Sequence, residues 1–90
     1  MKKVQILEIN NYDYLVRTED NKKYNLNMEF YSLNIILKEK DYIYISQKIL
    51  DEKNFYSFGP LNPNNINVDE DDIIKIISDD KEIYFQRYYG

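Results

Sequence analysis

The alternation of apolar and polar side chains over residues 22–30 is the feature that most constrains the fold. Tyr24, Leu26, Met28 and Phe30 are separated one by one by polar or charged residues. Successive side chains of a strand point to opposite faces, so a period of two sorts them into an apolar face and a polar face. Residues 22–30 therefore predict a strand with one buried face and one face in water.

The preceding run from Tyr12 to Arg17 has the same alternation and predicts the partner strand of a hairpin. Glu19, Asp20 and Asn21 lie between the two runs, and Asn21 tolerates the left-handed conformation that the third position of such a loop requires. The resulting register pairs Val16 with Tyr24, Tyr14 with Leu26 and Tyr12 with Met28. All three pairs lie on the apolar face, which supports this register.

Residues 2–9 predict a first strand that is apolar on both faces. Asn10 and Asn11 fit a type I′ turn, whose two central residues both need positive φ. This turn pairs Ile9 with Tyr12 and Leu7 with Tyr14, and it leaves Val4 and Ile6 on the opposite face. Such a strand is either sandwiched between two layers or curls from one sheet into the next, often at a bulge.

The middle of the chain predicts shorter elements. Residues 31–40 form either a short helical turn or an irregular crossing, and residues 41–46 form a strand. Residues 48–53 form a turn or a short helix, and residues 54–58 a short strand. Pro63 and the repeated Asn and Asp residues predict an Asn/Asp-rich loop over residues 59–72.

The C-terminal part of the chain predicts a second hairpin, between residues 73–77 and 82–88. A loop of either two or four residues pairs Ile76 with Ile83 and Ile74 with Phe85 on the core side. On the other side, Lys75 then faces Tyr84 and Ile77 faces Glu82.

These elements predict one small β-barrel. The chain of 90 residues supports one hydrophobic core, so residues 1–90 are expected to form a single domain. Three consecutive antiparallel strands, a linking segment and further strands predict an all-β fold that is mainly antiparallel, with at most one short helix. The expected architecture is a small, partly open OB-like or SH3-like barrel of about five to seven short strands.

One short segment carries a resemblance to known barrels. Residues 37–45, Leu-Lys-Glu-Lys-Asp-Tyr-Ile-Tyr-Ile, resemble the Leu-Lys-x-Gly-Asp-x-Val entry to a strand that is common in OB-fold and SH3-like barrels. Lys40 stands where those families usually have Gly. The whole chain is similar to small uncharacterised OB-fold-like or SH3-like β-barrel proteins of low-GC bacteria, and this resemblance implies no activity.

The chain has no His and no Cys, which excludes disulfides, thiolate chemistry and the usual zinc ligands. The serines consequently have no His to activate them. The acidic run from Asp69 to Asp72 lacks the alternating spacing of a calcium loop, and adjacent carboxylates usually solvate a loop. We expect no catalytic residue, no cofactor and no metal site, and hence a protein that is not an enzyme.

Four tyrosines mark a candidate interaction surface: Tyr42, Tyr44, Tyr84 and Tyr88. Their strand parity is opposite to that of the core residues beside them, so we expect them on an outer face. Aromatic side chains gathered on a surface are typical of protein interfaces. Two plainer explanations stay open. A low-GC genome enriches tyrosine codons, and residues 46–72 could cover this face if Phe55, Tyr56 and Phe58 fold back over it.

These features predict a non-enzymatic binding or protein-interaction module whose partner is another protein or a second copy of the chain. The net charge of −4 disfavours nucleic acid as a partner, and a nucleic-acid-binding OB-like domain is the alternative. No apolar run approaches the ~20 residues of a membrane span, and polar residues interrupt the N-terminal segment. We therefore expect no membrane association and a cytoplasmic location.

Overall fold

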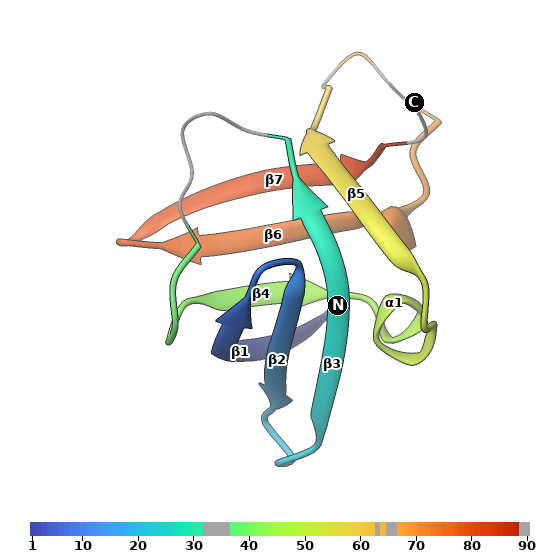
Figure 1. Cartoon of the computed structure of the whole chain (residues 1–90). Helices are drawn as coiled ribbons and strands as arrows, with labels where there is room; N and C mark the ends of the chain where they lie inside the picture. The colour runs from blue at the N-terminus through green and yellow to red at the C-terminus, as the bar shows by residue number, and fades with distance from the viewer. Residues whose placement is uncertain (32–36, 63, 65–66, 89–90) are drawn as a thin grey trace.

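Seven strands close into a barrel in the order β1-β2-β3-β5-β7-β6-β4 (Figure 1). The computed structural model describes residues 1–31, 37–62, 64 and 67–88. Within them the elements are β1 (Lys2–Asn10), β2 (Asp13–Thr18), β3 (Lys23–Phe30), β4 (Tyr42–Ile45), α1 (Gln47–Asp51), β5 (Phe55–Pro60), the 3-10 helix η1 (Glu70–Asp72), β6 (Ile73–Ser78) and β7 (Lys81–Arg87). The predicted fold class, a small and mainly antiparallel barrel with one short α-helix, is confirmed, but the barrel is closed and not partly open, because β4 pairs with both β1 and β6.

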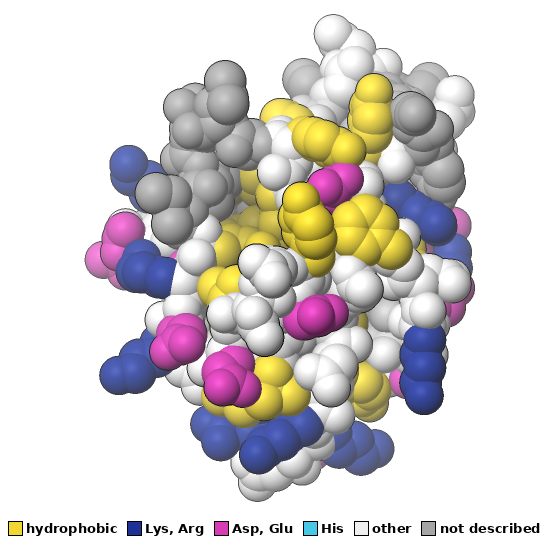
Figure 2. Space-filling model, in the orientation of Figure 1, with side chains coloured by type: hydrophobic (Ala, Val, Ile, Leu, Met, Phe, Trp, Pro, Cys, Tyr) yellow, Lys and Arg dark blue, Asp and Glu magenta, His cyan; other side chains and the backbone are white. Residues whose placement is uncertain are grey.

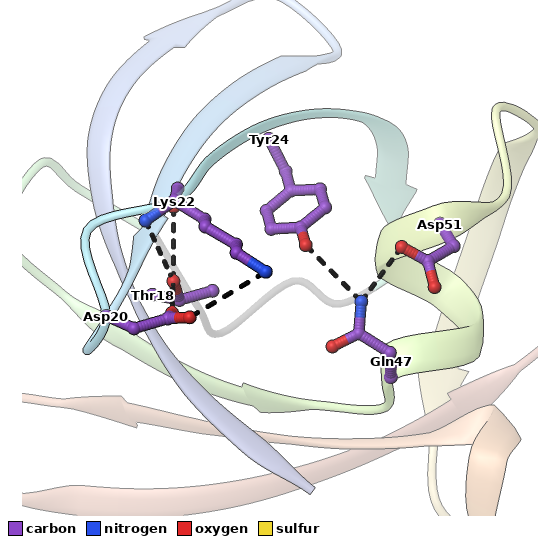
Figure 3. A network of polar contacts seen from close by, with 6 residues as sticks. All are labelled: Thr18, Asp20, Lys22, Tyr24, Gln47 and Asp51. Atoms are coloured by element: carbon purple, nitrogen blue, oxygen red, sulfur yellow. Dashed lines mark hydrogen bonds and ion pairs between the residues drawn. The ribbon is translucent and has the colours of Figure 1, made fainter.

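The hairpin of β2 and β3 has the predicted register. Val16 pairs with Tyr24 and Tyr14 with Leu26, and Asn21 has a φ of 66° in the connecting turn. Figure 3 shows how the turn is held: Lys22 N donates to Thr18 Oγ1 at 3.1 Å, and the Thr18 hydroxyl donates to the Asp20 carboxylate.

Tyr12 departs from the predicted pattern. Met28 N still donates to Tyr12 O at 2.9 Å, so the pairing of the backbones extends this far. The Tyr12 side chain, however, is 55% exposed and does not join the apolar face. Tyr12 lies in the turn that precedes β2, where its side chain is free of the strand alternation.

The predicted register of β1 against β2 is wrong. Asn10 pairs with Asp13 and Ile9 with Tyr14, so the turn consists of Asn11 and Tyr12 rather than Asn10 and Asn11. Asn11 has a φ of 57°, and Tyr12 has no positive φ. The error arises because either Asn can occupy a left-handed position. The sequence alone therefore does not decide between two turn positions that differ by one residue.

A β-bulge in β1 explains why this strand is apolar on both faces. The register shifts between Ile6 and Glu8, so Leu7 is the extra residue. Val4 and Ile6 point into the core before the bulge, and Ile9 packs against the core after it. The predicted curl at a bulge is therefore confirmed, and it reverses the strand parity once.

The parallel pair of β3 and β5 closes one side of the barrel. Met28 pairs with Tyr56 and Phe30 with Phe58. The rings of Phe30 and Phe58 are stacked with centroids 5.5 Å apart, and Phe85 of β7 contacts Phe30 edge-on at 5.4 Å. The segment between β3 and β4, predicted as a turn or crossing, lies partly outside the described residues.

The C-terminal hairpin has the predicted pairs. Ile76 pairs with Ile83 and Ile74 with Phe85. The loop has two residues, Asp79 and Asp80, with φ of 50° and 64°, which is the backbone that a type I′ turn requires. The shorter of the two predicted loops is therefore present.

The barrel interior is filled from all of its strands and from α1. Its buried apolar residues are Val4, Ile6, Tyr14, Val16, Leu26, Met28, Ile43, Ile45, Ile49, Leu50, Tyr56, Phe58, Ile74, Ile76 and Phe85. Burial of these side chains is the main favourable term in the folding of so small a domain.

The segment from β4 to β6 contains the short α1 and ends with η1. Ser46 caps α1, since its Oγ accepts from Ile49 N at 3.2 Å, and the same hydroxyl donates to Asp71 O at 2.9 Å. Gln47 of α1 donates to the Tyr24 hydroxyl of β3 at 3.3 Å (Figure 3).

β5 continues to Pro60, so the Asn/Asp-rich loop begins later than predicted. No helix among the described residues is long and apolar enough to cross a membrane.

Lys40 adopts a backbone conformation that favours glycine. Its φ is 77°, and its N–H donates to Ile6 O at 2.8 Å, which docks the turn onto β1. The buried carboxylate of Asp41 accepts from Lys38 N at 2.9 Å and closes the same turn. A positive φ strains a residue that has a Cβ atom, so Gly would be favoured at the position of Lys40.

We predict that Lys40→Gly stabilises the protein. Relief of the left-handed strain is worth about 1–2 kcal/mol, and the greater freedom of Gly in the unfolded chain offsets about 0.5–1 kcal/mol of it. The expected gain in the free energy of unfolding is about 0.5–1 kcal/mol, measured by urea denaturation. Lys40→Ala is the control, because it removes the charge but keeps the Cβ atom, and it should give no gain. Equal effects of both variants would show that charge, and not backbone strain, is responsible.

Candidate functional site

Three of the four predicted surface tyrosines lie on the outside of β4 and β7. Tyr42 and Tyr84 are 37% and 44% exposed, and Tyr44 is half-buried. Tyr44 pairs with Lys75 of β6, which pairs in turn with Tyr84. We call Lys3, Tyr42, Tyr44, Lys75 and Tyr84 the lysine–tyrosine face.

Lysine side chains cover two rings of the lysine–tyrosine face. Lys3 Nζ lies 4.5 Å from the centroid of Tyr42, and Lys75 Nζ lies 4.3 Å from the centroid of Tyr44. Lys75 also pairs with Glu82 at 3.7 Å. Cations and rings therefore alternate here, and the attraction between them holds both kinds of side chain against the sheet.

Tyr88, the fourth predicted tyrosine, has different neighbours. Its backbone N–H donates to Ser57 O at 2.6 Å, and its ring contacts Tyr31 edge-on at 5.5 Å. It lies beyond the end of β7, next to β5, whereas Tyr84 lies next to β6. The strand parity predicted correctly that Tyr88 points outward, but not which residues surround it.

The described part of residues 46–72 does not cover these tyrosines as a fold-back would. Tyr56 and Phe58 are 3% and 0% exposed because they belong to the core. Phe55 is 48% exposed and contacts Tyr12 edge-on, with centroids 5.8 Å apart.

A second set of aromatic residues gathers over β3 and β5. Tyr12 and Phe55 form one edge-on pair, Tyr31 and Tyr88 form another, and all four side chains are about half exposed, from 48% to 55%. Glu29 belongs to the same set. Figure 2 shows apolar side chains over β3 and β5 with an acidic side chain among them. We call Tyr12, Glu29, Tyr31, Phe55 and Tyr88 the front aromatic face.

Glu29 is fixed at the centre of this face by two hydroxyl groups. The Tyr31 hydroxyl donates to Glu29 Oε1 at 2.6 Å, and Ser57 Oγ donates to the same oxygen at 2.9 Å. In the β3–β5 pair, Glu29 lies opposite Ser57. The preceding pair on the same face of the sheet is Asn27 opposite Phe55. The hydrogen bond to the Glu29 carboxylate is the main cause that raises the pKa of Tyr31 above 10.0.

A shallow hollow adjoins the front aromatic face. It has a volume of about 310 Å³ and lies between Tyr12 and Tyr31, with Tyr14 and Phe30 among its lining residues. The lining combines aromatic carbon with the Glu29 carboxylate. This is the chemistry of a contact surface for a side chain, because the hollow is open and small compared with a typical ligand pocket.

A related arrangement is built into the same chain at Tyr56. The Tyr56 hydroxyl donates to the Glu52 carboxylate, and the Arg87 guanidinium lies 4.4 Å from the centroid of the Tyr56 ring. Burial, followed by the bond to Glu52, raises the pKa of Tyr56 to about 12. A tyrosine thus contacts a carboxylate through its hydroxyl and a cation through its ring.

The acidic run ends in a capped turn. Asp69 Oδ1 accepts from Asp71 N at 3.0 Å, which caps η1, and Asp72 lies 4.0 Å from Lys48 Nζ. Among the described residues, no three acidic side chains are grouped so that they could hold a metal ion.

Comparison with protein-family models, curated proteins and solved structures gives no match for this chain.

Most of the front aromatic face was missed by the sequence analysis. The sequence pattern predicts Tyr12 on the apolar face and, in one alternative, Phe55 as a cover over the outer tyrosines. One signal could have found part of it: Phe30 points inward, so Glu29 and Tyr31 on either side must point outward. The grouping of these residues with Phe55 and Tyr88 depends on pairing between distant strands.

We predict that Glu29→Gln lowers the pKa of Tyr31 toward its ordinary value. The neutral amide no longer disfavours the charged phenolate, so Tyr31 should ionise at lower pH. NMR of ring-labelled tyrosines, titrated from about pH 8 to 12, measures this directly. Glu82→Gln removes the same charge from β7, where Glu82 pairs with Lys75 and not with Tyr31, and should leave Tyr31 unaffected. An unchanged Tyr31 titration in Glu29→Gln would contradict the described hydrogen bond.

Proposed function

We propose that this protein is a non-enzymatic protein-interaction module whose main contact surface is the front aromatic face. The observation that carries the proposal is the pair of edge-on aromatic contacts, Tyr12 with Phe55 and Tyr31 with Tyr88, each about half exposed. Exposed aromatic side chains that are held rigid lose little entropy when a partner covers them, and they are enriched in binding hot spots.

The uses of the described serine hydroxyls support a non-enzymatic role. Ser46 caps α1, Ser57 donates to Glu29, and the Ser78 hydroxyl accepts from Lys38 Nζ at 3.2 Å. The chain has no His or Cys to serve as a base or a nucleophile near neutral pH. The front aromatic face offers a partner four aromatic rings and one carboxylate, that of Glu29.

We predict that peptides selected from an unbiased library bind at the front aromatic face. Phage that display random heptapeptides are selected on the wild-type protein, and each clone is then measured on two double variants. Tyr31→Ser with Tyr88→Ser should weaken binding by about tenfold or more, as expected for hot-spot rings. Tyr42→Ser with Tyr84→Ser is the matched control and should change binding by less than about threefold. No enrichment, or equal loss in both variants, would refute the proposal.

Self-association is the second part of the proposal, with Tyr42, Tyr44 and Tyr84 as the contributing residues, since Tyr88 lies with Tyr31 on the front aromatic face. Covering their exposed rings with a second copy would remove apolar surface from water at about 25 cal/mol per Å². We expect the mass in sedimentation equilibrium to rise from monomer toward dimer over about 10–100 µM. Tyr42→Ser with Tyr84→Ser should restore the monomer. A wild-type mass that stays monomeric across this range would exclude this part and leave the peptide result standing.

Single-stranded nucleic acid is the alternative partner, and the lysine–tyrosine face is the observation that favours it. Lys3 and Lys75 alternate with tyrosine rings, as in surfaces that stack bases and neutralise phosphates. The net charge of −4 counts against it. We predict no saturable binding of a labelled oligothymidylate below about 10 µM in about 150 mM salt. Tighter binding that Lys3→Gln with Lys75→Gln abolishes would favour the alternative.

A further inference from the structure

Within the described part of the chain, three tyrosine rings each have a cation above them. Lys3 lies over Tyr42 at 4.5 Å, Lys75 over Tyr44 at 4.3 Å and Arg87 over Tyr56 at 4.4 Å. Over the four rings of the front aromatic face, residues 1–31, 37–62, 64 and 67–88 place no cation. The front aromatic face therefore differs in this respect from Tyr42, Tyr44 and Tyr56.

The pair of Tyr31 and Glu29 resembles the pair of Tyr56 and Glu52. In both pairs the phenol hydroxyl donates to a glutamate carboxylate. Tyr56 is buried, and its ring is covered by Arg87. The hydrogen bond from Tyr56 is the main cause that lowers the pKa of Glu52, and the positive charge of Arg87 acts in the same direction. Tyr31 is 52% exposed and Glu29 is half-buried, so neither side chain is enclosed in the core as Tyr56 is.

We propose that the front aromatic face binds an arginine side chain presented by an extended basic segment of a partner protein. This inference rests on the proposed function and names the chemistry of the partner. A guanidinium group is planar and weakly hydrated, so it stacks on an aromatic ring while its N–H groups donate to a carboxylate. Tyr31 supplies the ring, and Glu29 supplies the carboxylate.

The layout of the face explains why the partner segment is extended. Along β3 and β5, the pair of Tyr12 and Phe55 lies on one side of Glu29, and the pair of Tyr31 and Tyr88 lies on the other. A segment that crosses both aromatic pairs passes over the carboxylate between them. The acidic net charge of the protein also favours the approach of a basic partner.

The test uses a fluorescein-labelled hexapeptide of alternating Arg and Gly, with Lys/Gly and Glu/Gly hexapeptides for comparison. Binding to the full chain is measured by fluorescence anisotropy in about 150 mM salt, where weak surface attraction is screened. We expect saturable binding of the Arg peptide, weaker binding of the Lys peptide and none of the Glu peptide. Glu29→Gln should weaken binding of the Arg peptide about tenfold, the loss expected for one hydrogen bond between charged groups.

Two matched controls separate recognition from general charge attraction. Glu82→Gln makes the same change in net charge at a carboxylate that is 56% exposed and pairs with Lys75, and it should weaken binding by less than about twofold. Tyr31→Phe keeps the ring and should retain most of the affinity, whereas Tyr31→Ser should lose about as much as Glu29→Gln. Circular dichroism of each variant confirms that it is folded.

Three results would overturn the inference. One is equal weakening by Glu29→Gln and Glu82→Gln, which would indicate attraction by net charge alone. Another is absence of Arg-peptide binding; if library-selected peptides still require Tyr31 and Tyr88, the proposed function survives without the arginine. The third is a dimer that Glu29→Gln dissociates, because the occupant of the face would then be a second copy of the chain.

Discussion

The parallel pairing of β3 with β5 is the contact on which both the core and the surface of this protein depend. It places Phe30 beside Phe58, and the Phe30 ring, which packs against the core, also contacts Phe85 of β7. The same pairing brings Ser57 to Glu29 on the outer side. Because the two strands are distant in sequence, the chain must close a long loop before these contacts form, and the aromatic packing has to offset that entropy.

The parts of the fold that the sequence predicts are those fixed by neighbouring residues. The register of β2 against β3 follows from Asn21 in the turn and from the apolar alternation on both sides of it. The register of β6 against β7 follows in the same way from Asp79 and Asp80. In both hairpins the turn chemistry and the side-chain pattern agree, and a slip of one residue would turn the apolar set toward water.

The parts that could not be predicted depend on choices that local sequence leaves equal. Asn10 and Asn11 are equivalent turn residues, and the observed register, with its bulge at Leu7, is the one that packs Ile9 against the core. The candidate site has the same limitation. Strand parity places Tyr42, Tyr84 and Tyr88 on the outside, but it does not say that Tyr88 contacts Tyr31. To predict that contact, one must know which strands lie beside β5, and the order of the strands depends on the whole barrel.

The closed ring of strands limits how another molecule can be recognised. Many proteins bind extended peptides by adding them as an extra strand to an open sheet edge, where backbone hydrogen bonds supply affinity for almost any sequence. Each of the seven described strands has a hydrogen-bonded neighbour on both sides, so none of them is an edge strand. Affinity for the proposed partner would therefore come from side chains on the outer surface. A few substitutions there could change the partner while the barrel beneath stays intact, which would let this scaffold acquire new specificities without new folding problems.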